Sequence, residues 1–285
     1  MKFANIIRKL YAEPWLVTPA MHKTMCEILR AHIGGGRNVD LATVVSVAEP
    51  EWDKDEKDTP QQALPANIAY VPVVGVIGQR LSSMEQMCGG VDVLALRQTM
   101  DAALINPGIT GVLLHLSTPG GAVTGIPEMA EYIENYGKPI VAFTDDICAS
   151  AGYWLASQCS AIVASLSAQV GCIGVYQAFL DESRAYEMDG YKTELFKTGK
   201  YKGMGTPGLP LTDEQRALIQ GGVDQVFVWF KHAVTDARPK VSDEEMQGQT
   251  FYAEDAIKRG LVDDLGDMAA AVQLLQEIIQ RGQSN

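Results

Sequence analysis

The chain has 285 residues, 47% of them hydrophobic and 20% charged, which is typical of a globular protein and excludes a disordered or fibrous one. Acidic residues outnumber Lys and Arg by 35 to 23, and the formal charge of −12 argues against a general role in binding nucleic acid. No apolar run reaches the roughly 18 residues of a membrane span, so we expect no membrane partner and a soluble, cytoplasmic protein. The five cysteines include no C-x-x-C pair, which predicts reduced thiols rather than disulfides or a zinc site.

The first part of the chain predicts a small helical segment followed by a linker. Thr18 is a typical helix N-cap with Pro19 after it, and the helix that starts there ends at the glycines 34–36. A charged stretch between two prolines follows, with little to bury. We therefore predict three parts, which are a helical segment over residues 1–47, a linker over 48–66 and a main domain over 67–285.

The main domain alternates strand and helix signals, which predicts an α/β fold with a mostly parallel sheet flanked by helices. The expected strands lie at residues 70–77, 111–116, 139–143, 161–164, 173–179 and 192–196. The expected helices between and after them lie at residues 91–105, 124–136, 149–158 and 268–280. Thr212 opens a further long helix, because Gln215 three residues later completes a capping box. Residues 251–265 are expected to add a short helix and a strand.

A Pro-Gly-Gly turn follows the strand that ends at Leu116. Adjacent glycines such as Gly120 and Gly121 can expose consecutive backbone N–H groups to a ligand oxygen, as in an oxyanion hole. A plain tight turn is the alternative interpretation, and it needs no function.

Ser150 stands among small residues at the start of a predicted helix, after the strand 139–143. An accessible hydroxyl in that place is suited to nucleophilic chemistry, since the helix dipole favours developing negative charge. The common structural role of such a serine is to cap the helix.

A loop at residues 198–205 carries Lys200 and Lys202. Most such pairs lie in solvated basic loops. A functional role as a base would require a lysine to lose its proton near neutrality, although its ordinary pKa is about 10.4; burial beside a serine hydroxyl can produce that change.

Four segments, taken together, resemble the S49 peptidases over about residues 71–265. They are Ser-Thr-Pro-Gly-Gly, Ala-Ser-Ala-Gly-Tyr-Trp, Gly-Cys-Ile-Gly-Val and Thr-Gly-Lys-Tyr-Lys-Gly-Met-Gly. This family comprises the signal peptide peptidase A group and bacteriophage prohead, or minor capsid protein C, proteases. The opening Glu-Pro-Trp-Leu-Val-Thr-Pro at residues 13–19 resembles the phage branch.

The resemblance implies a ClpP/crotonase-like fold and a serine peptidase with a Ser/Lys dyad that needs no metal and no cofactor. Carried over by motif, Ser150 is the nucleophile, Lys202 the general base, and Gly121 with Gly120 the oxyanion hole. Cys172 stands where the family usually has a serine that orients the lysine, and a thiol is a weaker hydrogen-bonding group. The lysine is then held less firmly, or by another group such as Tyr176 or a water.

The sequence positions of the histidines exclude a histidine as the base of such a site. A ClpP-type protease needs a histidine shortly after its serine helix, and here none occurs between Ser150 and His232. If Ser150 is activated, a lysine must therefore activate it. Lys192, Lys197 and Lys200 are rivals to Lys202, which the motif favours.

The expected substrates are polypeptides, namely phage capsid, scaffold or portal proteins during prohead maturation in the host cytoplasm. Substrate backbone is expected to pair with a strand edge beside the Pro-Gly-Gly turn. The resemblance also implies a homo-oligomeric ring in which neighbouring protomers share each site. Two alternatives stay open: a crotonase-type enzyme acting on an acyl-CoA, and a catalytically silent capsid-assembly module.

Overall fold

The central element of the fold is a parallel five-stranded sheet. The structure is a computed structural model that describes residues 14–18, 21, 23, 25–26, 64–87 and 89–283. The strand order is β12-β9-β7-β5-β2, and every neighbouring pair is parallel. The strands are β2 (Ile68–Val74), β5 (Gly111–Ser117), β7 (Ile140–Thr144), β9 (Ala161–Ala164) and β12 (Asp264–Leu265). The expected α/β architecture is confirmed.

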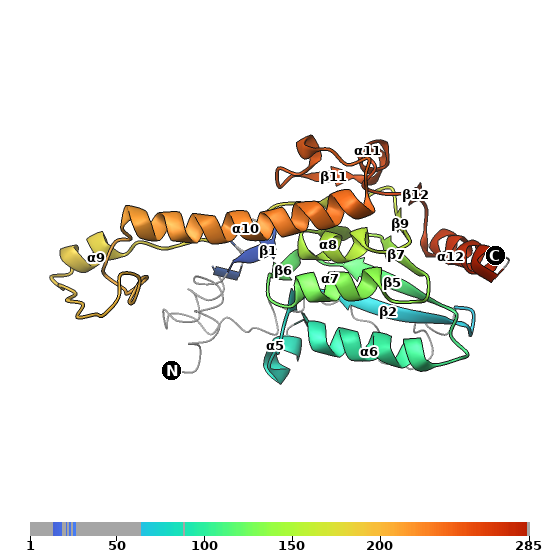
Figure 1. Cartoon of the computed structure of the whole chain (residues 1–285), viewed down its shortest axis with the longest axis horizontal. Helices are drawn as coiled ribbons and strands as arrows, with labels where there is room; N and C mark the ends of the chain where they lie inside the picture. The colour runs from blue at the N-terminus through green and yellow to red at the C-terminus, as the bar shows by residue number, and fades with distance from the viewer. Residues whose placement is uncertain are drawn as a thin grey trace.

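Helices cover both faces of this sheet, because its strands are apolar on both sides (Figure 1). One face packs on α12 (Met268–Gln283), whose Leu275 and Ile279 contact the cluster around Leu113 and Val141. The other face packs on the larger core, which includes α6 (Val93–Ile105), α7 (Ile126–Glu134) and α8 (Ala151–Ser157).

Two smaller sheets extend the fold near the start of α8. The first has the order β1-β6-β3-β4, and the second the order β11-β10-β8. Their strands are β1 (Trp15–Val17), β3 (Val76–Gly78), β4 (Gly90–Asp92), β6 (Gly120–Ala122), β8 (Ile147–Ala149), β10 (Gln169–Gly171) and β11 (Thr250–Tyr252). Short helices, α5 (Ser83–Met87) and α11 (Ala253–Lys258), complete these parts.

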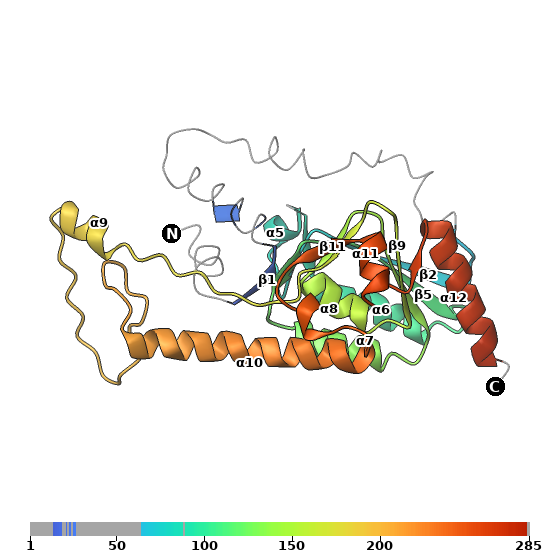
Figure 2. The same cartoon turned by 90° about the horizontal axis from the view of Figure 1, so that it is seen from above.

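The long helix α10 (Asp213–Ala237) projects from the body as an arm (Figures 1 and 2). Its expected capping box is confirmed, since the Thr212 hydroxyl accepts from the Gln215 N–H at 3.2 Å. The far end of the arm carries α9 (Ser183–Met188) and the loops on either side of it. Along this helix, Phe230 and Val234 are buried against the body, whereas Leu218 near the tip is 48% exposed.

Two predicted strands are wrong. Residues 173–179 form no strand and make only one isolated bridge, between Tyr176 and Trp15. Residues 192–196 lie on the arm without a neighbouring strand, and Phe196 is 91% exposed. Apolar composition favours a strand only where a second strand supplies its backbone hydrogen bonds, and neither segment reaches the sheet.

The predicted segment 1–47 and linker 48–66 lie mostly outside the described residues, so this division stays a prediction. Within the part that the structure does describe, we find no helix that combines the length and the apolar character needed to cross a bilayer.

Candidate active site

Ser150 lies in the turn between β8 and α8, with an unusual backbone conformation. Its φ of 54° and ψ of −115° are uncommon for a residue with a side chain, and such strain persists only where neighbouring contacts impose it. The Ser150 N–H donates to the Gly171 carbonyl at 2.8 Å, and its own carbonyl accepts from the Trp154 N–H at 2.9 Å. Strand β10 and helix α8 therefore fix the serine from both sides.

The Ser150 side chain does not cap the helix. It is 1% exposed, and its Oγ has no hydrogen-bond partner of ordinary geometry. Leaving a buried hydroxyl without a partner costs about 1–3 kcal/mol, so folded proteins seldom keep one without a use for it. The helix-cap interpretation is therefore wrong for this serine, because its hydroxyl makes no capping hydrogen bond.

The predicted Pro-Gly-Gly turn lies directly beside Ser150. A Cβ added to Gly120, whose φ is +106°, would lie 2.9 Å from the Ser150 Cβ and 1.9 Å from the Leu16 carbonyl oxygen. At Gly121, an added Cβ would lie 1.9 Å from the Ile77 carbonyl oxygen. Both positions therefore require glycine because backbone passes so close to them. The Gly120 N–H donates to Thr118 Oγ1 at 3.1 Å.

Sequence analysis did not anticipate that β1 reaches this turn. Strand β1 pairs antiparallel with β6, with Leu16 opposite Gly121 and Val17 opposite Gly120. The only signal in the sequence is that residues 15–17 are consecutive apolar residues before a helix cap, and such a short run does not identify its partner strand.

Cys172 lies against the Ser150 hydroxyl and shares its unusual backbone conformation, with a φ of 54°. Burial raises the pKa of the Cys172 thiol to about 11, and the polar contact with the Ser150 hydroxyl partly offsets this rise. The thiol is therefore protonated near neutral pH.

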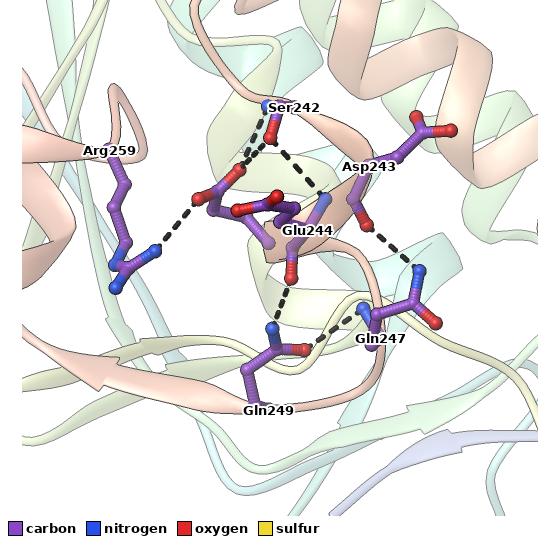
Figure 3. A network of polar contacts seen from close by, with 7 residues as sticks. Ser242, Asp243, Glu244, Gln247, Gln249 and Arg259 are labelled. Atoms are coloured by element: carbon purple, nitrogen blue, oxygen red, sulfur yellow. Dashed lines mark hydrogen bonds and ion pairs between the residues drawn. The ribbon is translucent and has the colours of Figure 1, made fainter.

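A polar network holds residues 242–249, the segment to which the Cys172 backbone is hydrogen-bonded. Figure 3 shows this network. The Cys172 N–H donates to the Gln249 carbonyl at 2.7 Å, and the Gln249 side chain in turn donates to the Glu244 carbonyl. The Ser242 N–H and Oγ donate to the Glu245 carboxylate at 3.0 and 2.6 Å, and these bonds hold the pKa of Glu245 below its usual range. This network fixes the backbone that positions the thiol beside Ser150.

Lys202 and Ser150 are not brought together within one chain. Lys202 is exposed in the loop at the tip of the arm. Its neighbour Lys200 pairs with Glu214 at 2.7 Å, in the first turn of α10. Glu214 precedes Phe230 by sixteen residues, or about 24 Å of helix, and it is Phe230 that contacts α8.

The other candidate bases also lie away from Ser150 in the same chain. Lys192 pairs with Glu194 at 3.2 Å, and Lys197 donates to the Lys200 carbonyl at 3.0 Å. Among the histidines, which the sequence excludes as the base, His115 is hydrogen-bonded to Tyr70 and Asp145, at 2.7 and 2.9 Å. Nor do the described residues include a group of three or more His, Cys, Asp or Glu arranged to hold a metal ion.

The model of peptidase family S49 matches residues 133–281, the part that contains Ser150, Cys172 and Lys202. The chain belongs to peptidase family S49. This confirms the family that the four sequence motifs indicated.

Two phage proteins are similar along almost the whole chain. Capsid assembly protease C of Escherichia phage lambda is 26% identical, over 98% of this chain and 67% of that protein. The head-tail preconnector protein GP5 of Enterobacteria phage P21 is 23% identical, over 95% of this chain and 57% of that protein. Protease 4 of Haemophilus influenzae is 26% identical over 77% of this chain, but only 36% of that longer protein. The chain thus spans between about a third and two thirds of these relatives.

Several solved structures are similar to this one at low sequence identity. An enoyl-CoA hydratase from Shewanella pealeana is 11% identical with a TM-score of 0.47, over 76% of this chain and 72% of that chain. A ClpP1 mutant from Listeria monocytogenes is 10% identical with a TM-score of 0.44, over 74% of this chain and 98% of that chain.

Proposed function

We propose that this S49 peptidase is a serine endopeptidase in which Ser150 is the nucleophile and Lys202 of a neighbouring copy is the general base. The observation that carries the proposal is the Ser150 hydroxyl, which is buried, without a hydrogen-bond partner and beside a glycine turn. A nucleophile of this kind needs a base, and the lysine that the family motif selects lies on the projecting arm of the same chain. A lysine from a second copy of the chain is not bound by this separation of Lys202 from Ser150 within one chain.

Exposed apolar side chains on the arm support such an assembly. Phe196, Tyr191 and Met188 are 91%, 67% and 82% exposed, and Leu218 adds to this surface on α10. Apolar surface of this kind is typical of a site of association.

The proposed reaction is hydrolysis of a peptide bond through an acyl-enzyme. Neutral Lys202 accepts the proton from Ser150 Oγ as this oxygen attacks the scissile carbonyl carbon. Backbone N–H groups of the turn at Gly120 and Gly121 hold the tetrahedral oxyanion once the Gly120 N–H has left Thr118 Oγ1, a contribution of about 3 kcal/mol in comparable sites. The protonated lysine donates to the leaving amine as the C–N bond breaks, and water then releases the acyl group by the same steps.

The substrate class is proposed from the names of the relatives. The lambda protein is a capsid assembly protease, and the P21 protein is a head-tail preconnector protein. We therefore propose that this chain cleaves phage head proteins during assembly of the prohead.

A fluorophosphonate probe followed by peptide mapping tests the nucleophile. The proposal expects covalent labelling of Ser150, and a folded protein that stays unlabelled there would exclude a serine peptidase. That outcome would favour an acyl-CoA enzyme or a silent assembly module.

Subunit mixing tests the shared dyad. Ser150→Ala and Lys202→Met proteins should each be inactive, and their mixture should regain proteolysis once subunits exchange. Lys192→Met, which removes an exposed charge from the same arm, should remain active and serves as the matched control. If native mass spectrometry confirms exchange and the mixture stays inactive, the two residues do not act across an interface.

A further inference from the structure

Strand β1 lies between two segments that border Ser150. On one side it pairs antiparallel with β6, the strand that begins at Gly120. On the other side Trp15 exchanges backbone hydrogen bonds with Tyr176, since the Trp15 N–H donates at 2.9 Å and its carbonyl accepts at 3.3 Å. A three-residue strand with partners on both edges has the geometry of an extended peptide bound by strand addition.

The same strand passes within contact range of the proposed nucleophile. The Leu16 carbonyl oxygen and the Ser150 Cβ lie on the same side of Gly120, because a Cβ added there would clash with both, at 1.9 and 2.9 Å. One residue further on, the Thr18 N–H donates to the Pro119 carbonyl at 3.0 Å. Residues 16–18 therefore run along the turn that is proposed to hold the oxyanion.

The pairing register explains which backbone groups β1 occupies. In an antiparallel ladder, pairs that exchange hydrogen bonds alternate with pairs that do not. Since Thr18 bonds to Pro119, the next hydrogen-bonded pair is Leu16 with Gly121. The backbone groups of Gly121 that a substrate strand would use are then engaged by the chain's own Leu16.

We infer that β1 occupies the substrate-binding edge of β6 and that a polypeptide substrate binds by displacing Trp15–Val17. The inference rests on the proposed peptidase function and deepens it, because it names both the substrate edge and its resident competitor. The apparent affinity for a peptide equals its intrinsic affinity multiplied by the fraction of molecules whose edge is open. The chain is therefore held in a latent state until β1 leaves.

The environment of β1 also defines the class of peptide that fits. All three residues are at most 4% exposed. Leu16 packs into the main core, whereas Trp15 and Val17 belong to a separate small cluster that includes Ala122 and Tyr176. The edge consequently selects an extended segment with three consecutive apolar residues.

A reversible crosslink tests the displacement. Trp15 and Ala122 are opposite each other, and Trp15 directs its hydrogen bonds to Tyr176, so this pair is one of the non-bonded pairs of the β1–β6 ladder. Such pairs have Cα atoms about 4.5 Å apart, within the range that a disulfide spans. The test protein is the full chain with Ser150→Ala, Trp15→Cys and Ala122→Cys.

The probe is a fluorescein-labelled peptide Pro-Trp-Leu-Val-Thr, the sequence of residues 14–18, and its binding is followed by anisotropy. With the disulfide confirmed by intact mass, we expect at least tenfold weaker binding than after reduction. The protein with Trp15→Cys but native Ala122 should bind equally under both conditions. Equal affinity of the crosslinked and reduced double-cysteine protein would overturn the inference.

A second variant weakens β1 without the crosslink. Val17→Asp places a charge in the small cluster outside the main core, so we expect at least tenfold tighter binding of the probe in the Ser150→Ala background. A peptide with Asp in place of its Leu should not compete. Unchanged or weaker probe binding by a folded Val17→Asp protein would mean that β1 is a permanent part of the fold.

These measurements separate the inference from the peptidase proposal. Probe binding is measured without Ser150 and needs no turnover, so it can succeed even if fluorophosphonate never labels the wild-type serine. Conversely, a wild-type enzyme that labels and cleaves, but whose crosslink leaves probe affinity unchanged, would retain the peptidase proposal and exclude displacement of β1.

Discussion

The indole ring of Trp154 in α8 and the phenyl ring of Phe230 in α10 stack face to face, with centroids 4.5 Å apart and planes 4° from parallel. Both side chains are buried, at 2% and 0% exposure. The backbone N–H of Trp154 in turn donates to the Ser150 carbonyl at 2.9 Å. The base of the arm is therefore packed on the helix turn that begins at the proposed nucleophile.

Phe230→Ala should lower the free energy of unfolding by about 3–5 kcal/mol, because it leaves a cavity against Trp154 at the base of the arm. Chemical denaturation measures this loss. Val228→Ala, on the exposed side of the same helix at 42% exposure, should stay within about 0.5 kcal/mol of wild type. Equal effects of the two substitutions would show that the stacked pair does not hold the arm.

Ser150→Ala should reduce proteolysis by at least about 10³-fold while leaving the fold unchanged, since only the unpartnered oxygen is removed. The expected melting temperature is equal to or above that of wild type, because a buried hydroxyl without a partner disappears. Circular dichroism and cleavage of a denatured protein substrate provide the two measurements. Near-full activity of the variant would assign the nucleophile to another residue.

Gly120→Ala should abolish activity and destabilise the protein, because its Cβ would overlap the Leu16 carbonyl oxygen and strain a backbone with φ of +106°. Gly221→Ala is the matched control, since a Cβ there meets nothing within 4 Å in helix α10 and should add about 1 kcal/mol of stability. Thermal unfolding of both variants checks the contrast. A stable and active Gly120→Ala protein would contradict the close approach of these segments.

Cys172→Ser should be tolerated and should flatten the alkaline dependence of stability. The folded-state pKa of the thiol is raised to about 11 from an ordinary 9.0, so its neutral form is favoured by folding. That contribution is present below pH 9 and falls as pH rises towards 11, by about 2 kcal/mol. Denaturation of wild type and variant between pH 8 and 11 measures the difference. Parallel curves would show that the Cys172 thiol does not make this contribution.

The family and the parallel sheet could both be predicted from the sequence alone. Strands such as 111–117 and 161–164 are predictable because they are apolar on both sides, a pattern that buried parallel strands require. The capping box at Thr212 is predictable because it depends on side chains only three residues apart. The absence of histidine between Ser150 and His232 needs no structure at all.

Tertiary structure decided everything that depends on which segments meet. Residues 192–196 and 111–117 were both expected to form strands, but only the second has neighbouring strands, and the first lies on the arm. The separation of Lys202 from Ser150 follows from the direction in which α10 leaves the body, which no local pattern encodes. Strand β1 reaches Ser150 across more than a hundred residues of chain, and long-range pairing of this kind is set by the packing of the whole fold rather than by the three residues themselves.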